Sequence, residues 1–558
     1  MKLPALALAF AAAVTVPRPA LAEEPKLVVA ILVDQLRYDY LERFHDEFSP
    51  GGFRLLTDQG TFMTFAEYNY CPTITGPGHA SFLSGAPPAV HGIISNDWFD
   101  KRTGKMLNCV ADDSVKGVGG NAATTAGGNE AEAAEGVKDE GKRSPRNFIG
   151  SNFSDEMRLR FHSKVVGISL KDRGAILPAG KKPAGAYWFD STSGNFITST
   201  YYMPALPEWV RKFNARKRPA DFVGQVWKRL LAPEAYQWPD QAAGEGVMPR
   251  EKTPTFDHTV YPSPVEGFET IVPTPYGNQL LAEFAVAALE GEHLGTGPQP
   301  DVLTVSFSSI DAAGHRFGPY SQEVQDATLR LDLELAQFFA VLDKKIGLKN
   351  VAIVLTADHG VAPTPEFASE QGFAGRRVES GLLMVDLQAR MDERFGPGKY
   401  FLAPKPIDGN LYFDHQLLRD RKLDADMVAN FIREWALSDG RFQAAFTRAQ
   451  LLDGRAPGLI GQRVLNGYNP ERSGDVVWVL KPYSIAMGGK AGTTHGAPFS
   501  YDTHVPVLFY GSAFKHGRFA DEFYITDIVP TLCAAFHLNE PPGCIGKPCV
   551  KVLEEEGK

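Results

Sequence analysis

Residues 351–360, VAIVLTADHG, join a run of strand-forming apolar residues directly to an acid, a histidine and a glycine. The run shows no polar alternation, which is typical of a strand buried on both faces in a largely parallel sheet. In open sheets of this kind, ligands bind beyond the carboxyl ends of the strands. The stretch therefore predicts an α/β fold, and it places Asp358 and His359 at the sheet edge where a functional site is expected.

The same pattern recurs along the chain. Further apolar runs occupy residues 27–33, 165–170, 302–306, 476–480 and 505–510. Helix-like stretches lie among them, at residues 40–45, 278–294, 321–342, 425–437 and 525–536. Because strands alternate with helices, a layered α/β domain is the predicted fold.

Three segments fall outside this alternation. Residues 111–146 are rich in Gly, Ala, Glu and Asn, which predicts a mobile surface loop. Residues 172–275 and 362–490 carry many Pro, Trp and charged residues, and we interpret them as insertions that cap the sheet. A length of 558 residues fits one large catalytic domain with such insertions, and equally two to four domains.

The composition is that of a globular protein with a sizeable core, since 44% of the residues are hydrophobic and 22% are charged. The net charge of -9 has the wrong sign for nonspecific binding to nucleic acid, and no nucleic-acid partner is expected. Any phosphate group that binds must therefore meet a local positive site, such as metal ions.

The first 22 residues have the three parts of a secretory signal peptide. Lys2 supplies the positive start, residues 3–16 are apolar, and Ala20-Leu21-Ala22 offers a small-x-small cleavage site. The alternative is a buried N-terminal helix. The pattern predicts a periplasmic or secreted protein with residues 23–558 as the mature catalytic domain. No other segment approaches the ~20 apolar residues of a membrane span, so stable membrane insertion is not expected.

Five cysteines in an exported chain suggest one or two disulfides, and the close spacing of Cys544 and Cys549 favours that pair. The cysteines lack the paired spacing of a zinc-thiolate site.

Acids and histidines follow several of the predicted strands. Asp34 follows residues 27–33, Asp311 and His315 follow residues 302–310, and His495 lies in the late sequence GTTHG. Singly, each has an ordinary explanation as a cap, a turn residue or a satisfied polar group. Together with Asp358 and His359, they supply two sets of oxygen and nitrogen ligands of the kind that zinc accepts.

A second motif, CPTITGPGH, occupies residues 71–79. Pro77 indicates a helix start, which places the Thr75 hydroxyl and free backbone N–H groups at the positive end of a helix. Such a position suits an anion. The alternative is an ordinary threonine N-cap.

Taken in order, these motifs resemble the alkaline phosphatase superfamily. They comprise Asp34 after a strand, Pro72-Thr73-x-Thr75, Asn96 in HGIISN, Asp311-x-x-x-His315, Asp358-His359-Gly360 and Thr494-His495-Gly496. The nearer resemblance is to the threonine-nucleophile branch, which includes nucleotide pyrophosphatase/phosphodiesterases and phosphate-irrepressible alkaline phosphatases of the PafA type. Residues 169–180, SLKDRGAILPAG, resemble the PafA type in particular. The resemblance implies a three-layer α/β/α sandwich with a largely parallel central sheet.

The resemblance also implies a role for each motif residue. Thr75 would be the nucleophile, and Asn96 and the backbone N–H near Gly76 would donate to phosphate oxygens. Lys171 and Arg173 would face the second negative charge of a monoester. Two zinc ions per chain would be held by Asp311, His315 and His495 in one site, and by Asp34, Asp358, His359 and Thr75 in the other.

The function expected from this resemblance is zinc-dependent hydrolysis of phosphate monoesters through a phospho-threonine, with lower phosphodiesterase activity. The first alternative is a nucleotide pyrophosphatase/phosphodiesterase, which would share Thr75 and Asn96 but not the Lys171 and Arg173 pair. A secreted protein with a structural zinc site is the second alternative, although such sites lack a nucleophile and open positions. Sulfatases are excluded because the Cys/Ser-x-Pro-x-Arg context is absent. Monomer and dimer both remain open.

Overall fold

The computed structural model describes residues 25–120, 141–263 and 267–554. The predicted signal peptide lies outside these residues. At the centre is a ten-stranded sheet with the order β20-β2-β19-β13-β1-β12-β7-β8-β9-β6. Four neighbouring strands at its middle run parallel: β13 (Val351–Thr356), β1 (Leu27–Val33), β12 (Asp301–Phe307) and β7 (Val165–Ser169). All residues of these four strands are buried, as their mostly apolar sequences predict.

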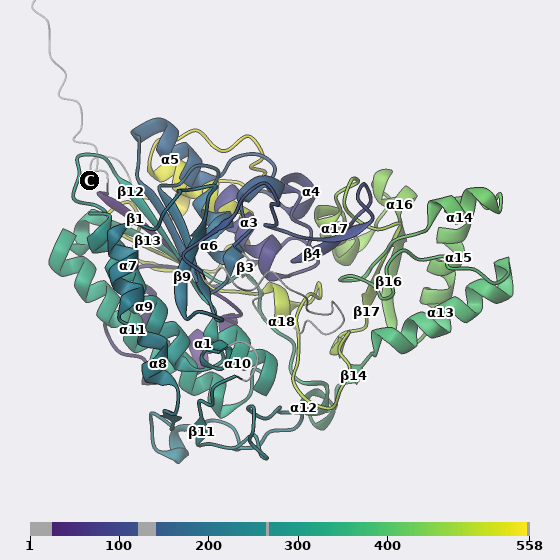
Figure 1. Cartoon of the computed structure of the whole chain (residues 1–558), viewed down its shortest axis with the longest axis horizontal. Helices are drawn as coiled ribbons and strands as arrows, with labels where there is room; N and C mark the ends of the chain where they lie inside the picture. Colours follow the sequence, from purple (N-terminus) through teal and green to yellow (C-terminus); the bar gives the residue numbers. More distant parts are fainter. Residues whose placement is uncertain (1–24, 121–140, 264–266, 555–558) are drawn as a thin grey trace, which may run out of the picture.

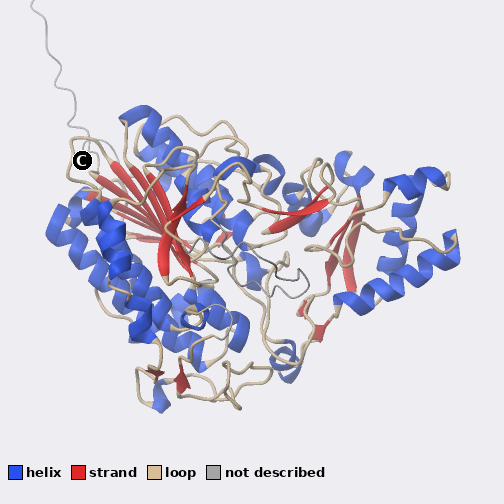
Figure 2. Cartoon of the chain, in the orientation of Figure 1, coloured by secondary structure: helices blue, strands red, loops and turns tan. Residues whose placement is uncertain are grey.

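Helices cover both faces of this sheet (Figure 1, Figure 2). One layer holds α7 (Glu208–Ala215), α9 (Pro275–Gly291) and α11 (Gln322–Ile346). The other holds α3 (Thr75–Ser84), α5 (Phe153–Phe161), α6 (Asp172–Ala179) and α19 (Ile528–Ala535). The expected three-layer α/β/α architecture with a largely parallel sheet is confirmed.

The insertion expected at residues 172–275 begins later than the sequence suggested. Helix α6 leads into β8 (Gly185–Asp190), which pairs in parallel with β7, and β9 (Asn195–Ser199) then pairs antiparallel with β8. These strands are short and aromatic, GAYWFD and NFITS, so they lack the Val, Ile and Leu runs that marked the other strands. Residues 172–199 therefore belong to the central domain.

The described ends of the segment expected to be a mobile loop, residues 111–120 and 141–146, make contacts with the central domain. Its first part contributes β6 (Gly117–Val118), which pairs with β9 at the sheet edge. At its other end, the Ser144 hydroxyl donates to Asp112 Oδ2 at 2.6 Å, and Arg143 Nε lies 2.6 Å from Asp172 Oδ2. Both ends are thus tied to the domain, while residues 121–140 lie outside the described residues.

Residues 362–490 form a lobe beside the central domain, drawn in green at the right of Figure 1. Its three-stranded antiparallel sheet has the order β15-β17-β16, with bounds Asn410–Leu411, Val476–Leu480 and Phe442–Thr447. Helices α13 (Ser380–Phe395) and α15 (Ala425–Ser438) pack on this sheet around a separate apolar core. The run at residues 476–480 is therefore a strand of the lobe, not of the central sheet. Strand β19 (Val507–Tyr510) does join the central sheet, but antiparallel to β13.

All five cysteines are free, so the expected disulfide between Cys544 and Cys549 is absent. Cys544 packs instead near Gly85, at the end of α3, while the Cys549 backbone N–H donates to Thr531 Oγ1.

None of the helices in the described part of the chain has both the length and the apolar character that crossing a membrane requires.

Candidate active site

Three parallel strands bring the predicted acids to one edge of the sheet. Asp34 directly follows β1, Asp358 follows β13, and Asp311 lies in the first turn of α10 (Ser309–Phe317) after β12. Because the strands are in register, with Val33 opposite Phe307, their carboxyl ends meet at the same level. The three acids are 0%, 0% and 3% exposed.

The acids and histidines form two adjoining groups whose ligand atoms lie within 4.8 Å of one another in each group. One group contains Asp311, His359 and His495, and the other contains Asp34, His79 and Asp358. This grouping differs from the predicted one, because His359 stacks on His495 with ring centroids 3.4 Å apart. Its Nε2 also lies 3.2 Å from Asp358 Oδ2, so His359 stands between the two groups.

His315 lies at the margin of the first group. It is one helical turn after Asp311 on α10, and its Nε2 lies 3.3 Å from Asp311 Oδ1. The predicted i, i+4 spacing therefore places both side chains on the same face of the helix. All six predicted acid and histidine ligands are gathered in a single site.

Backbone carbonyl groups orient the three predicted histidine ligands. Each ring places Nδ1 within hydrogen-bonding distance of a carbonyl oxygen, at 2.9 Å for His315 and Thr493, 2.9 Å for His359 and Gly360, and 2.8 Å for His495 and Thr73. A histidine that donates from Nδ1 presents Nε2 as the ligand atom, which is the usual arrangement around a bound metal.

His79 is the last residue of the CPTITGPGH motif, but it was not predicted as a site residue. Its Nδ1 lies 2.8 Å from the Thr75 carbonyl oxygen and its Nε2 lies 2.8 Å from Ser306 Oγ. It also lies 3.4 Å from Asp34 Oδ1. Burial lowers the pKa of His79, but the Asp34 and Asp358 carboxylates and the Thr75 carbonyl together outweigh burial and raise it. With both ring nitrogens engaged by the protein, His79 orients Asp34 and Thr75. Its position one turn after Thr75 was the signal that could have found it.

The electrostatics of the site fit bound cations. Burial, followed by the nearby Asp34 carboxylate, raises the pKa of Asp358 to about 8, and Asp358 Oδ2 is buried without a hydrogen-bond partner. Burial also lowers the pKa of His359 to about 4, which keeps the ring neutral and able to bind a metal. Crowded carboxylates beside neutral imidazoles form a donor set that suits divalent metal ions.

Lys171 lies at the boundary of the two groups. Its Nζ is 2.9 Å from Asp34 Oδ2 and 2.6 Å from Asp311 Oδ2, so it joins one acid from each group. Although burial opposes the charged form, these two carboxylates raise the Lys171 pKa above its ordinary value. The ammonium group is therefore a fixed positive charge inside the site.

Thr75 is the first residue of α3 and is 1% exposed. Its Oγ1 lies 3.3 Å from His359 Nε2, beside the acid and histidine groups. The helix approaches the segment after β13 closely, because a Cβ added at Gly78 would lie 2.7 Å from Asp358 Cβ. Glycine at this position thus allows the positive end of α3 to reach the metal-binding groups.

The predicted phosphate donor at Gly76 requires a correction. The Gly76 N–H donates to Asn96 Oδ1 at 2.8 Å. The first N–H groups of a helix have no partner within the helix, and the Asn96 amide oxygen satisfies this one. Gly76 therefore fixes the orientation of Asn96, and the Asn96 Nδ2 group is the donor that remains for an anion.

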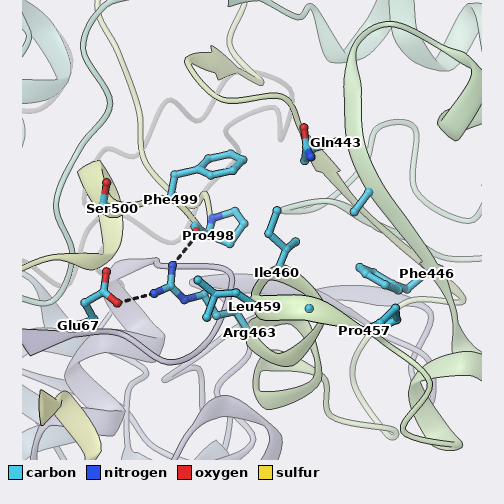
Figure 3. A pocket seen from close by; sticks show the side chains of 12 residues that line it. Glu67, Gln443, Phe446, Pro457, Leu459, Ile460, Arg463, Pro498, Phe499 and Ser500 are labelled. Carbon is cyan, nitrogen blue, oxygen red and sulfur yellow. Dashed lines mark hydrogen bonds and ion pairs between the residues drawn. The ribbon is translucent and has the colours of Figure 1, made fainter. Parts of the chain in front are cut away.

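A cavity of about 640 Å³ lies elsewhere, between α17 (Gly458–Gly467) and residues 498–500 (Figure 3). Arg463 faces Glu67 there with 2.7 Å between Nη2 and Oε2. Because Glu67 already neutralises this arginine, and the lining includes no predicted site residue, the cavity is not the candidate site.

A comparison with family models matches residues 28–501 to "Type I phosphodiesterase / nucleotide pyrophosphatase". The chain belongs to this family. The matched residues include every predicted site residue, from Asp34 to His495.

Several curated relatives align over nearly their whole length. Alkaline phosphatase PafA of Elizabethkingia meningoseptica is 38% identical over 95% of this chain and 94% of its own. A calcium-transporting ATPase of Myroides odoratus is 36% identical over 96% and 95%, and alkaline phosphatase PhoV of Synechococcus elongatus is 36% identical over 96% and 94%.

The solved structures agree. The crystal structure of PafA matches with a TM-score of 0.87 and 37% identity, covering 95% of this chain and 99% of that one. Murine ectonucleotide pyrophosphatase/phosphodiesterase 5 matches with a TM-score of 0.51 and 14% identity over 95% and 100%, which shows a shared fold.

Arg173 belongs to a cluster of charged side chains that also includes Asp172 and Arg143. Of these three residues, only Arg173 was predicted as a site residue. Asp172 Oδ1 accepts a hydrogen bond from the Arg173 backbone N–H at 2.6 Å, and Asp172 Oδ2 lies 2.6 Å from Arg143 Nε. Burial raises the pKa of Asp172, but Arg143 and Arg173 together hold it below its ordinary value. Arg143 was missed because it lies in the segment expected to be a mobile loop.

Proposed function

We propose that this chain is a metal-dependent alkaline phosphatase that hydrolyses phosphate monoesters through a phospho-threonine intermediate on Thr75. The position of the Thr75 hydroxyl carries the proposal, because it lies at a helix start, 3.3 Å from His359 Nε2, beside two groups of metal-binding side chains. The identity of 36–38% to the alkaline phosphatases PafA and PhoV supports the same activity.

The proposed cofactors are two zinc ions. One would be held by Asp311, His315 and His495, and the other by Asp34, Asp358, His359 and Thr75. When bound, zinc supplies positive charge at the reacting oxygens and lowers the pKa of the attacking hydroxyl. The mixture of carboxylate and imidazole donors supports this choice of metal.

The side chains then have distinct tasks. The Thr75 hydroxyl loses its proton as its oxygen attacks phosphorus, the bond from phosphorus to the ester oxygen breaks, and the departing oxygen takes up a proton to leave as the alcohol. Water next attacks the phospho-threonine, which releases inorganic phosphate and restores the Thr75 hydroxyl. The Asn96 amide and the positive end of α3 hold the phosphate oxygens during both steps.

Specificity for monoesters is assigned to Lys171 and Arg173. A monoester is a dianion at alkaline pH, whereas a diester carries one charge and an additional substituent. A buried ammonium group within the site favours the dianion, and each charge-assisted contact is worth about 1.5–3 kcal/mol. The alternative, a nucleotide pyrophosphatase/phosphodiesterase, is favoured by the family description.

A side-by-side assay of an aryl phosphate monoester and the matching diester, on purified protein of measured metal content, tests this proposal. We expect the monoester to have the higher kcat/KM. Lys171→Ala combined with Arg173→Ala should lower monoester kcat/KM on the order of a hundredfold or more and affect the diester much less. A faster diester reaction in the wild-type protein would contradict the proposal. Equal losses on both substrates, together with lost metal, would show that the pair acts on metal placement.

We also propose export to the periplasm or the exterior, on the pattern of residues 1–22. The exported protein should begin at Glu23 when its N-terminus is sequenced. Recovery of an exported chain that still begins at Met1 would refute cleavage at this position.

A further inference from the structure

Gln35, directly after Asp34, has an unusual backbone conformation. Its φ is 64°, in the left-handed region, and its side chain is fully buried at 0% exposure. Glycine adopts this region without strain, whereas a residue with a Cβ does so at a cost in free energy. Such strain persists only where the surrounding structure enforces it, and it often marks a residue needed at a functional site.

The contacts of Gln35 reach both groups of metal-binding side chains. Its backbone N–H donates to Asp358 Oδ1 at 3.1 Å. Its side-chain Nε2 donates to Asp311 Oδ1 at 2.6 Å. One residue therefore holds an acid from each group, and the left-handed backbone lets the amide and the N–H point to different acids.

Helix α10 closes the other side of the Gln35 amide. A Cβ added at Gly314 would lie 2.9 Å from Gln35 Cδ and closer still to Oε1. Gly314 stands between Asp311 and His315, so the helix that carries these two side chains packs directly on the amide. The amide is thereby fixed with its donor facing Asp311.

The two oxygens of Asp311 consequently have different neighbours. Oδ1 accepts from Gln35 Nε2, while Oδ2 faces Lys171 Nζ at 2.6 Å. A carboxylate held in this way keeps one orientation and directs its remaining lone pairs to a single place. Partners of this kind around metal ligands typically change metal affinity or activity by about 10–100-fold when they are removed.

We propose that Gln35 is a positioning residue that fixes Asp311 and Asp358 relative to each other, and so sets the geometry of the two metal sites. This inference rests on the proposed two-zinc function. Methionine at this position would keep the approximate length of the side chain and the strained backbone but remove the donor. Glycine would relax the backbone, keep the N–H to Asp358 and remove the amide.

The test compares Gln35→Gly and Gln35→Met with the wild-type protein. Zinc affinity is measured by chelator competition, and the melting temperature is measured on the metal-free proteins. We expect both variants to bind one of the two zinc ions about 10–100-fold more weakly. The melting temperatures of the metal-free proteins check that both variants fold, since relief of the strained backbone in Gln35→Gly offsets part of the packing and hydrogen bonding that is lost.

His162→Gly is the matched control. His162 has φ 58°, caps α5 at its C-terminal end and is exposed, so it lacks contacts with the metal-binding groups. Its replacement should leave zinc affinity unchanged. Wild-type zinc affinity in both Gln35 variants would overturn the inference. A wild-type protein that binds no divalent metal would overturn the proposed function itself.

Discussion

At the scale of single residues, the site is organised by partners that come from distant parts of the chain. The carbonyl of Thr73 orients His495, and the carbonyl of Thr493 orients His315. The ligand positions are therefore set before any metal binds, which reduces the reorganisation that metal and substrate binding require. Because each of these carbonyl groups belongs to a loop, the orientation of His495 and of His315 depends on how that loop folds.

Asp502 links the segments that carry His495 and His359, and its burial makes the stability of the fold depend on pH. It is 0% exposed, its Oδ2 accepts from the Ala497 N–H at 2.7 Å, and its backbone oxygen accepts from the Gly360 N–H at 2.7 Å. Burial raises its pKa to about 8. Because the folded pKa lies above the unfolded one, the folded state keeps a proton that the unfolded state loses. Its stabilising contribution is complete below about pH 4 and is lost as pH rises towards 8.

We therefore expect Asp502→Asn to reduce the fall in unfolding free energy between pH 5 and pH 8, by at most ~1.4 kcal/mol per pH unit. Denaturant unfolding of the metal-free protein at a series of pH values measures this effect. An unchanged slope in the variant would show that Asp502 is ionised in the folded protein at neutral pH.

At the scale of elements, the close packing of α3 against the segment after β13 decides where the nucleophile lies. A Cβ at Gly78 would lie 2.7 Å from Asp358 Cβ and 2.8 Å from Asp358 Cα. Gly78→Ala should push the start of α3 away from Asp358 and His359. A displacement of about 1 Å at a reacting group can cost about 100-fold in rate. We expect a loss of this order in kcat/KM, measured with an aryl phosphate.

Gly381→Ala is the control for this substitution, because Gly381 is also helical and a Cβ there would meet no heavy atom within 4 Å. It should leave activity unchanged. Full activity of Gly78→Ala would mean that α3 tolerates a shift and that its contact with Asp358 does not place Thr75.

The sequence correctly predicted those strands and site residues that a local sequence pattern is sufficient to identify. Apolar runs identified β1, β12 and β13, and the acids within a few residues after them are Asp34, Asp311 and Asp358. Strands β8 and β9 were missed because their aromatic residues are buried by helices on both faces of the sheet, with Tyr187 and Phe196 against α9 and Trp188 in a cluster with α6, which no local pattern reveals. Gln35 was missed for a similar reason, since its role depends on Asp311 and Asp358, which are far away in the sequence.

At the scale of the whole molecule, the lobe at residues 362–490 supports the segment that carries Asn96. Arg472 Nη1 donates to the Asn147 carbonyl at 2.8 Å, and Asn469 Nδ2 donates to the Ala89 carbonyl at 3.1 Å. The Ser95 hydroxyl, next to Asn96, donates to Asp408 of the lobe. The sequence predicted an insertion here, but it could not predict these anchors, because they arise only when the lobe folds against the central domain.

The central claim is that Thr75 carries a phosphoryl group in a metal-dependent reaction, and the most direct measurement is acid trapping of the phospho-enzyme. The protein is mixed with a labelled monoester, quenched with acid and digested, and the labelled peptide is sequenced by mass spectrometry. We predict label on Thr75 in the zinc-loaded protein, and none after chelation or in Thr75→Ala, whose rate should fall by several orders of magnitude. Label on Ser81 or Ser84, or undiminished turnover by metal-free protein, would contradict the account.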